Sequence, residues 1–228
     1  GHISMVRAYE RTWMIHHHSA KVMENKRTGF MVLKQIMHYL NDMHRLPSAC
    51  MDYTMSYFRP ENKFPDRVFG GFAREYNNPR GCSLDLFAYL PYTRLSIGTK
   101  LPDGWTLSLS SDRDLWEFEH FYMSHSGGLL LDAMGLRHTD AGQDSLEEVY
   151  RNLGLTRTCQ TYSLKSNGKL TALLIANHSD LGFNLSELLN GIKVLVSNSK
   201  VLPWSVLSTA ISQLAGEYET ERVPVLFY

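Results

Sequence analysis

The chain has 228 residues, of which 43% are hydrophobic and 20% charged, a composition typical of a globular protein with a substantial core. Its 23 basic and 23 acidic residues give a formal net charge of zero, which argues against a nucleic-acid surface as the main function because phosphate neutralisation needs a basic excess. No apolar run approaches the roughly 20 residues that cross a bilayer, so no membrane span is predicted.

The start of the chain, Gly1 to Met5, resembles the remnant of an expression tag, and the fold is expected to begin at residue 6. No signal peptide is evident. The three cysteines, Cys50, Cys82 and Cys159, are odd in number and widely spaced, with no CxxC motif. Reduced, buried thiols are typical of a cytosolic protein, so a cytoplasmic location is expected. A catalytic cysteine is the alternative.

In the first ninety residues, strand patterns alternate with helix patterns. Apolar residues recur at helical spacing between Phe30 and Leu40, and Pro65 suits the first turn of a second helix. The expected order is strand 11–18, helix 30–40, strand 49–58, helix 65–76 and strand 82–90, the last ended by Pro91. This alternation favours a mixed or parallel sheet with helices on its faces.

A polar segment, residues 93–104, is the candidate linker to the second half. Two local signals beyond it are specific: Ser145 and Glu148 form a capping box, and Asn167-Gly168 predicts a tight hairpin turn. The expected elements are strand 105–110, a helix capped by Ser111 or Asp112, helix 128–135, a helix from Ser145, strands 158–164, 169–177 and 192–197, helix 203–218 and strand 223–228.

This order in the second half resembles a domain of the GNAT superfamily of acyl-CoA N-acyltransferases. In that family a hairpin leads to a central strand, which separates from its neighbour and admits the pantetheine arm of the donor. The N-terminus of the next helix holds the pyrophosphate. Residues 192–197 would be the central strand and residues 199–204 the pyrophosphate loop.

The first ninety residues resemble the C-terminal half of the same fold. The resemblance therefore implies an α/β fold of the α+β mixed-sheet type, with a central twisted mixed sheet flanked by helices. It also implies a tandem of two GNAT-like units, residues 6–92 and residues 105–228, joined by the linker 93–104.

The most specific motif of the family is Gln/Arg-x-x-Gly-x-Gly/Ala where the loop meets the helix. Small residues there let backbone N–H groups approach the pyrophosphate, and the helix N-terminus favours the anion. The first half keeps part of it in Lys26, Arg27, Thr28 and Gly29, without the second small residue, whereas the second half has Lys200 and no glycine. The resemblance implies that these four residues bind acetyl-CoA or a longer acyl-CoA. The alternative is a capped helix with a solvated basic loop.

The resemblance also implies an acid and a base. In GNAT enzymes a tyrosine often protonates the leaving thiolate, and a carboxylate often takes the proton of the amine. Tyr53 and Glu61 are the candidates for these roles, and Tyr57 shares a strand face with Tyr53. An aromatic stripe in the sheet is the alternative for the tyrosines. For the polar segment 59–74, which contains Glu61 and the pair Gly70-Gly71, the alternative is an ion-paired surface helix.

Three consecutive histidines, His16 to His18, lie on the first predicted strand, where His16 and His18 would share a face. Two histidines could ligate zinc, or one could act as a base, but no third ligand can be assigned, so no metal site is predicted. Packing of one histidine in the core and exposure of the others is the alternative. Hydrolase, nucleotide-triphosphatase and dinucleotide motifs are absent from the sequence.

The sequence thus favours a bacterial, cytoplasmic acyltransferase that moves an acyl group from acyl-CoA or an acyl-carrier protein to an amine. The acceptor would be a small molecule or a protein. The alternative is a non-catalytic GNAT-like module that binds a ligand or protein, as a regulatory domain in bacterial signalling. Neither hypothesis involves nucleic acid, a metal or a membrane span, and both leave room for a homo-oligomer.

Overall fold

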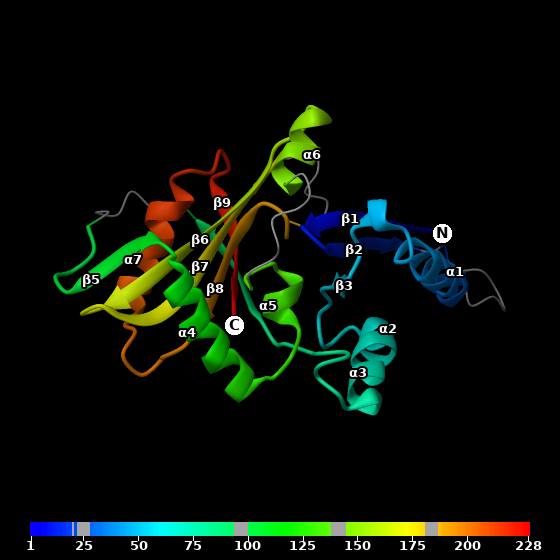
Figure 1. Cartoon of the computed structure of the whole chain (residues 1–228), viewed down its shortest axis with the longest axis horizontal. Coiled ribbons are helices and arrows are strands. Elements are labelled where there is room, and N and C mark those ends of the chain that lie inside the picture. Colours follow the sequence, from blue (N-terminus) through cyan, green and yellow to red (C-terminus); the bar gives the residue numbers. More distant parts are fainter. Residues whose placement is uncertain (20, 22–27, 94–99, 138–144, 181–186) are drawn as a thin grey trace. The chain divides into compact units, whose positions relative to one another are not determined.

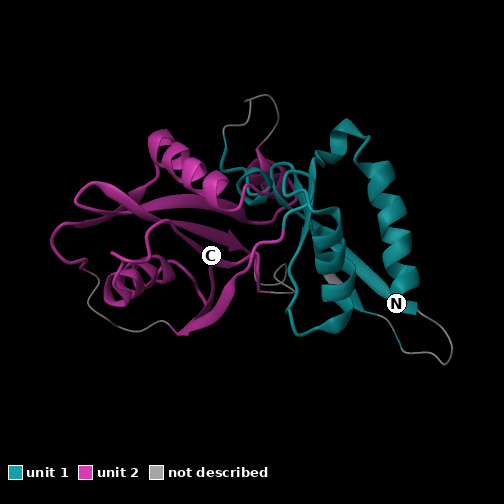
Figure 2. Cartoon of the chain, turned by 90° about the horizontal axis from the view of Figure 1, so that it is seen from below, with its two compact units in different colours: residues 1–83, 129–141 teal, residues 84–128, 142–228 magenta. Residues whose placement is uncertain are grey.

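The computed structural model of the chain describes residues 1–19, 21, 28–93, 100–137, 145–180 and 187–228. It divides into two compact units (Figure 2): unit 1 comprises residues 1–83 and 129–141, and unit 2 comprises residues 84–128 and 142–228. Each unit has its own mixed sheet with helices, so the fold is mixed α/β. Among the helices in the described ranges, none is both long and apolar enough to cross a membrane.

Unit 1 contains a three-stranded sheet within its described residues, in the order β1-β2-β3 (Figure 1). Strand β1 (His2–Tyr9) pairs antiparallel with β2 (Thr12–Ser19), and β2 pairs parallel with β3 (Tyr53–Ser56). Helix α1 (Thr28–Met43) lies between β2 and β3 in the chain, as the connection between parallel strands requires. Residues 2–5, set aside above as a tag remnant, are part of β1 and pair with β2, because backbone pairing needs only an extended neighbour.

Strand β3 is shorter than the predicted strand 49–58. A 3-10 turn, η1 (Pro47–Ala49), comes first, and Cys50 follows in the left-handed region with φ 46°. The Trp13 indole N–H donates to the Ala49 carbonyl at 2.7 Å, which fixes this turn against β2. The predicted strand therefore begins only at Tyr53, since the backbone turns before it.

The predicted helix 65–76 contains a local irregularity. It consists of α2 (Lys63–Pro65), a π-helical turn η2 (Asp66–Gly70) and α3 (Gly71–Tyr76). Arg74 pairs with Asp66 at 3.1 Å, and a Cβ on Gly70 would lie 2.7 Å from Asp66 Oδ1 and 2.9 Å from Arg74 Nη1. The ion pair is exposed and lies directly over Gly70, so this glycine allows the pair to close over the turn.

Unit 2 contains a six-stranded sheet within its described residues, in the order β4-β9-β8-β7-β6-β5. Its strands are β4 (Ala88–Thr93), β5 (Trp105–Leu109), β6 (Arg157–Ser166), β7 (Lys169–Ser179), β8 (Gly191–Val196) and β9 (Arg222–Phe227). Of the described pairings, β8 with β9 is parallel and the others are antiparallel. The helices in this part of the chain are α4 (Asp112–His125), α6 (Leu146–Asn152) and α7 (Trp204–Ala215), and α5 (Leu130–Ala133) belongs to unit 1.

Several local predictions for unit 2 are confirmed. Ser111 caps α4, and Ser145 with Glu148 forms the predicted capping box at α6. Asn167 and Gly168 have φ values of 48° and 79°, which is the paired left-handed conformation of a two-residue hairpin turn. These signals depend on neighbours in the chain, which is why the sequence reveals them.

The core of unit 2 lies between the sheet and α7. Alternate residues of the central strands, including Leu174, Val194 and Val225, pack against Ala210 and Ile211 of the helix. The prediction that Pro91 ends the preceding strand is wrong, because β4 continues through Pro91 to Thr93. Proline is tolerated in β4 because β4 is an edge strand, where a missing backbone N–H need not break the ladder. Pro91 lies opposite Pro224 of β9.

Candidate functional site

The predicted donor loop falls partly outside the described residues, which exclude Lys26 and Arg27. Thr28 and Gly29 are the first residues of α1, and the Gly29 carbonyl lies 3.1 Å from Nε2 of His18. The Thr28 hydroxyl oxygen is buried without a hydrogen-bond partner among the described residues. The start of α1 therefore lies beside the last residues of β2.

The histidine run does not form a metal site in the described part of the chain. His18 is engaged with the Gly29 carbonyl, and its ring stacks on Phe64 with 5.8 Å between centroids. No group of three or more histidine, cysteine, aspartate or glutamate side chains able to hold a metal occurs among the described residues. His18 thus contributes to local packing around the start of α1.

Tyr53 lies at the opposite end of the small sheet from Gly29. It is the first residue of β3 and pairs with Thr12, whereas Gly29 is beside His18. Thr12 and His18 are six positions apart on the strand, or about 20 Å at about 3.3 Å per residue. Of the predicted donor residues, Thr28 and Gly29 thus lie near the end of β2, whereas the predicted acid lies near its start.

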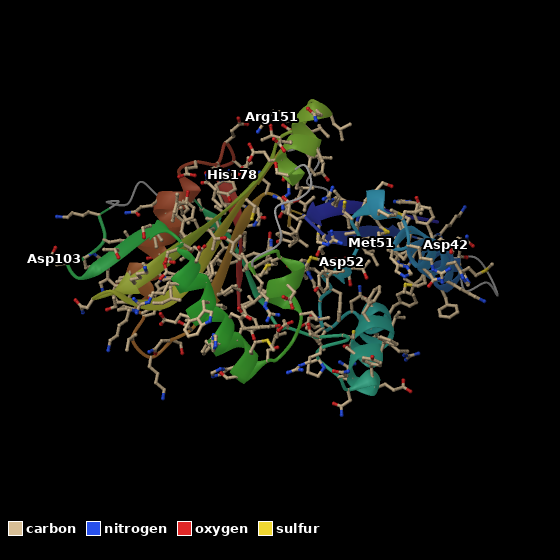
Figure 3. The ribbon with its side chains drawn as sticks, viewed as in Figure 1. Asp42, Met51, Asp52, Asp103, Arg151 and His178 are labelled. Atoms are coloured by element: carbon tan, nitrogen blue, oxygen red, sulfur yellow. The ribbon has the colours of Figure 1, made fainter. Side chains whose placement is uncertain are left out.

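Two ion pairs surround Tyr53. Arg11 binds Asp52 with Nη2 and Oδ1 2.7 Å apart, and Arg137 binds Asp132 at 2.8 Å (Figure 3 labels Asp52). Burial and the nearby carboxylates of Asp132 and Asp52 raise the pKa of Tyr53. The hydrogen bond from Arg11 holds the pKa of Asp52 below its usual value. Burial and these carboxylates disfavour the phenolate, so the phenol is protonated at neutral pH and is a weaker acid than a free tyrosine.

Glu61, the predicted base, is exposed in the turn between β3 and α2. Within the described residues no hydrogen bond joins it to Tyr53. The two candidates for acid and base therefore belong to the same unit but are not hydrogen-bonded to each other.

In unit 2 the carboxyl ends of β8 and β9 meet at one edge of the sheet. There the Val196 N–H donates to the Tyr228 carbonyl at 3.2 Å, and the Tyr228 N–H donates to the Val194 carbonyl at 2.9 Å. Helix α7 follows, and its N-cap Pro203 has no side-chain cap bond. The two parallel strands thus stay hydrogen-bonded as far as Tyr228, with no separation between them in this stretch.

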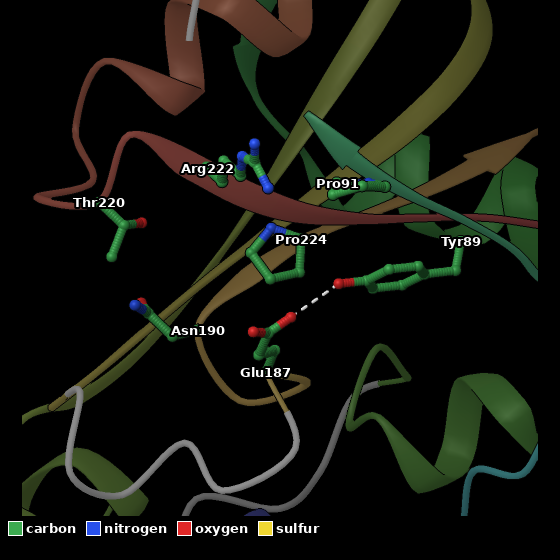
Figure 4. Close-up of a pocket in the computed structure, with 7 residues that line it drawn as sticks. All are labelled: Tyr89, Pro91, Glu187, Asn190, Thr220, Arg222 and Pro224. Atoms are coloured by element: carbon green, nitrogen blue, oxygen red, sulfur yellow. Dashed lines mark hydrogen bonds between the residues drawn. The ribbon is translucent and has the colours of Figure 1, made fainter. Parts of the chain in front are cut away.

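A pocket lies at the other end of the same two strands (Figure 4). It has a volume of about 300 Å³, and its lining residues come from β4, β9 and the segments before β8 and β9: Tyr89, Pro91, Glu187, Asn190, Thr220, Arg222 and Pro224. On β9, Arg222 and Pro224 alternate with Val223 and Val225, which face α7. The pocket therefore opens on the sheet face opposite α7.

The polar groups of the pocket are held in place by the local structure. The Tyr89 hydroxyl donates to Oε2 of Glu187 at 2.7 Å, and the Glu187 backbone has a left-handed φ of 58°. Buried Asn190 accepts a hydrogen bond from the Ser179 N–H at 3.3 Å. The Thr220 hydroxyl oxygen is buried without a partner among the described residues. The pocket thus combines a carboxylate, a guanidinium, an amide and a hydroxyl.

None of the pocket residues was predicted from the sequence. The Asn190-Gly191 dipeptide before an apolar strand was a local signal, but it also fits an ordinary turn. Tyr89 and Glu187 are 98 positions apart in the chain and meet only because β4 pairs with β9 at the edge of the sheet. Comparison of the chain with protein-family models, with characterised proteins and with solved structures found no match.

Proposed function

We propose that the chain is an acyltransferase of GNAT type, which moves an acyl group from acyl-CoA or an acyl-carrier protein to an amine. The observation that carries the proposal is the strand arrangement of unit 2. The antiparallel strands β6 and β7 lead to β8, helix α7 follows, and β9 returns parallel to β8. This is the arrangement that the resemblance in element order implies.

We also propose that the two units form a tandem of GNAT-like domains, which unit 1 supports. Its β1 and β2 are antiparallel, α1 follows β2, and β3 returns parallel to β2. The same succession occurs in unit 2 as β7, β8, α7 and β9. Two copies of one strand-strand-helix-strand arrangement are what a repeated domain would leave.

The proposed chemistry assigns a step to each candidate residue. The amine nitrogen attacks the thioester carbonyl carbon, the carbon–sulfur bond breaks, and the thiolate takes a proton from the phenol of Tyr53. Glu61 accepts the proton that the amine loses. Thr28 and Gly29, at the start of α1, would present backbone N–H groups to the donor pyrophosphate. Because about 20 Å of strand separates Gly29 from Tyr53, the donor has to lie extended along β2.

Titration calorimetry with acetyl-CoA and with a long-chain acyl-CoA tests the proposal. We expect one of them to bind and the binding to weaken at least about tenfold in Arg27→Ala, because a charged contact to phosphate is lost. Arg45→Ala, an exposed arginine after α1, is the matched control and should leave binding unchanged. Absence of binding by both thioesters at high protein concentration would overturn the proposal.

One observation favours the alternative, a non-catalytic GNAT-like binding module. The hydrogen bonds from Val196 to Tyr228 and from Tyr228 to Val194 keep β8 and β9 together where a donor arm would enter unit 2. Under this alternative, unit 2 would bind a ligand without transferring an acyl group to it. Ligand binding by a protein that binds neither thioester is the result that would favour the module over the enzyme.

A further inference from the structure

The pocket of unit 2 presents two opposite charges that are not paired with each other. Glu187 and Arg222 both line it, and among the described residues Arg222 has no ion-pair partner. Glu187 and Arg222 are both exposed to solvent. Separate charges of opposite sign in one small pocket suit a ligand that itself carries both an anionic and a cationic group.

The carboxylate of Glu187 is oriented for such a ligand. The Tyr89 hydroxyl binds its Oε2 at 2.7 Å, which leaves Oε1 for another donor (Figure 4). Glu187 is also held at a φ of 58°, a conformation that costs energy for a residue with a Cβ. Strain of this kind at a pocket is common where the position of a functional side chain matters.

A second observation points to a ligand on the other side of the pocket. The buried hydroxyl oxygen of Thr220 has no hydrogen-bond partner among the described residues, and Figure 4 shows Thr220 facing the same space as Asn190. Buried polar atoms are almost always paired in folded proteins. A polar ligand in the pocket would supply the missing partner.

The size and the apolar walls of the pocket limit the ligand. A volume of about 300 Å³ holds roughly ten non-hydrogen atoms, taking the 30 Å³ of a liquid water molecule for each. Pro91 and Pro224, directly opposite each other on β4 and β9, line it with rigid apolar rings. A small molecule with a short aliphatic part fits this space.

We infer that the pocket of unit 2 binds a free amino acid. Its ammonium group lies on Glu187, its carboxylate lies on Arg222, and its side chain packs against the two prolines. The inference rests on the pocket alone and does not depend on acyl transfer. A protein that binds an amino acid and no acyl-CoA would support it while contradicting the proposed function.

The test is a binding experiment with matched ligands. The full chain is titrated with L-leucine, with 4-methylpentanoate, which lacks the amino group, and with 3-methylbutylamine, which lacks the carboxylate. We expect leucine to bind about tenfold more tightly than either analogue, because each analogue loses one charged hydrogen bond. The other common free amino acids are titrated in the same way to define the preferred side chain.

Two variants test which residue binds the ammonium group of the ligand and which binds its carboxylate. Glu187→Gln should remove the preference for leucine over 4-methylpentanoate, and Arg222→Gln should remove the preference for leucine over 3-methylbutylamine. Glu221→Gln and Arg113→Gln change the same charges at exposed positions that do not line the pocket, and both should bind as the unchanged protein does. Glu187→Asp retains the negative charge and should retain part of the preference for the amine.

The results that overturn the inference are equally specific. If none of the common free amino acids binds at millimolar concentration, the pocket does not take this ligand class. If amino acids bind but Glu187→Gln and Arg222→Gln behave like the two control variants, the site lies elsewhere. Circular dichroism of each variant confirms folding, so that a loss of binding through unfolding is recognised as such.

Discussion

Gly191 lies where β8 comes close to β9 beside the pocket. A Cβ at this position would lie 2.5 Å from the carbonyl oxygen of Pro224, a backbone atom that cannot rotate away. The glycine therefore permits β8 and β9 to pair next to the pocket, and its small size matters more than its backbone freedom. Gly71 is different, because a Cβ there would meet only the Asp66 carbonyl at an ordinary 3.8 Å.

We predict that Gly191→Ala lowers the free energy of unfolding by about 1–3 kcal/mol, the usual cost of forcing extra volume into a packed interior. Gly71→Ala lies in a helix and should be neutral or stabilising by up to about 1 kcal/mol. Urea titration of both variants measures the difference. Equal midpoints for Gly191→Ala and the unchanged protein would show that β8 and β9 can move apart at little cost.

At the scale of elements, the end of β7 is joined to the segment after α7 by His178 (labelled in Figure 3). Its ring stacks on Tyr218 at 4.2 Å, and its Nε2 lies 3.7 Å from Oε2 of Glu217. The Tyr218 hydroxyl donates to the Asn177 carbonyl at 3.0 Å. Burial lowers the pKa of His178, Glu217 opposes this, and Arg157 adds to the lowering. The folded protein therefore favours neutral His178.

We predict from this that stability falls on acidification. The unfolded chain protonates His178 near its ordinary pKa of about 6.5, whereas the folded protein resists, so the unfolded state binds more protons as the pH drops below about 6.5. The contribution is fully present above that pH and is lost below it. In His178→Gln the free energy of unfolding should decrease less between about pH 7 and pH 5.

His38→Gln, at an exposed position of α1, controls for the other histidines and should keep the pH dependence of the unchanged protein. Urea unfolding at a series of pH values measures the three slopes. A His178→Gln slope equal to that of the unchanged protein would mean that His178 is not held neutral in the fold.

At the scale of the whole molecule, the chain leaves unit 2 and returns to unit 1 for residues 129–141. Two hydrogen bonds attach this segment to the rest of unit 1. The buried Thr12 hydroxyl donates to the Ala133 carbonyl at 2.6 Å, and the Leu129 N–H donates to the Ser83 hydroxyl at 3.0 Å. Unit 1 is thus completed by residues more than a hundred positions away from β2.

We predict that Thr12→Val selectively weakens unit 1. The valine cannot donate, so the buried Ala133 carbonyl loses its partner, at a cost of about 1–3 kcal/mol. Hydrogen exchange followed by mass spectrometry should show less protection in β1 to β3 and unchanged protection in β6 to β8. Thr106→Val, at an exposed position of β5, is the control. An equal loss of protection in both sheets would contradict the division into two units.

The predictions that succeeded concern residues close together in the chain. The capping box of Ser145 and Glu148 and the turn at Asn167-Gly168 are local arrangements, and both are present. The strand 49–58 was predicted too long, because its composition suits a strand while the turn at residues 47–49 is fixed by a hydrogen bond from Trp13. Pro91 was predicted to end its strand, because proline fits poorly inside a sheet. It is tolerated in β4 because β4 is an edge strand, and only the pairing of the strands reveals this.

By itself the sequence determined the mixed α/β class, most of the elements, and their succession, because hydrophobic period, caps and turns act over a few residues. Only the tertiary structure decided which strands are neighbours, that residues 129–141 belong with unit 1, and that Tyr89, Glu187 and Arg222 share a pocket. The physical reason is that sheet pairing joins backbone groups, which all residues share. Side chains that strand pairing brings together from positions about a hundred residues apart produce no periodic pattern in the sequence.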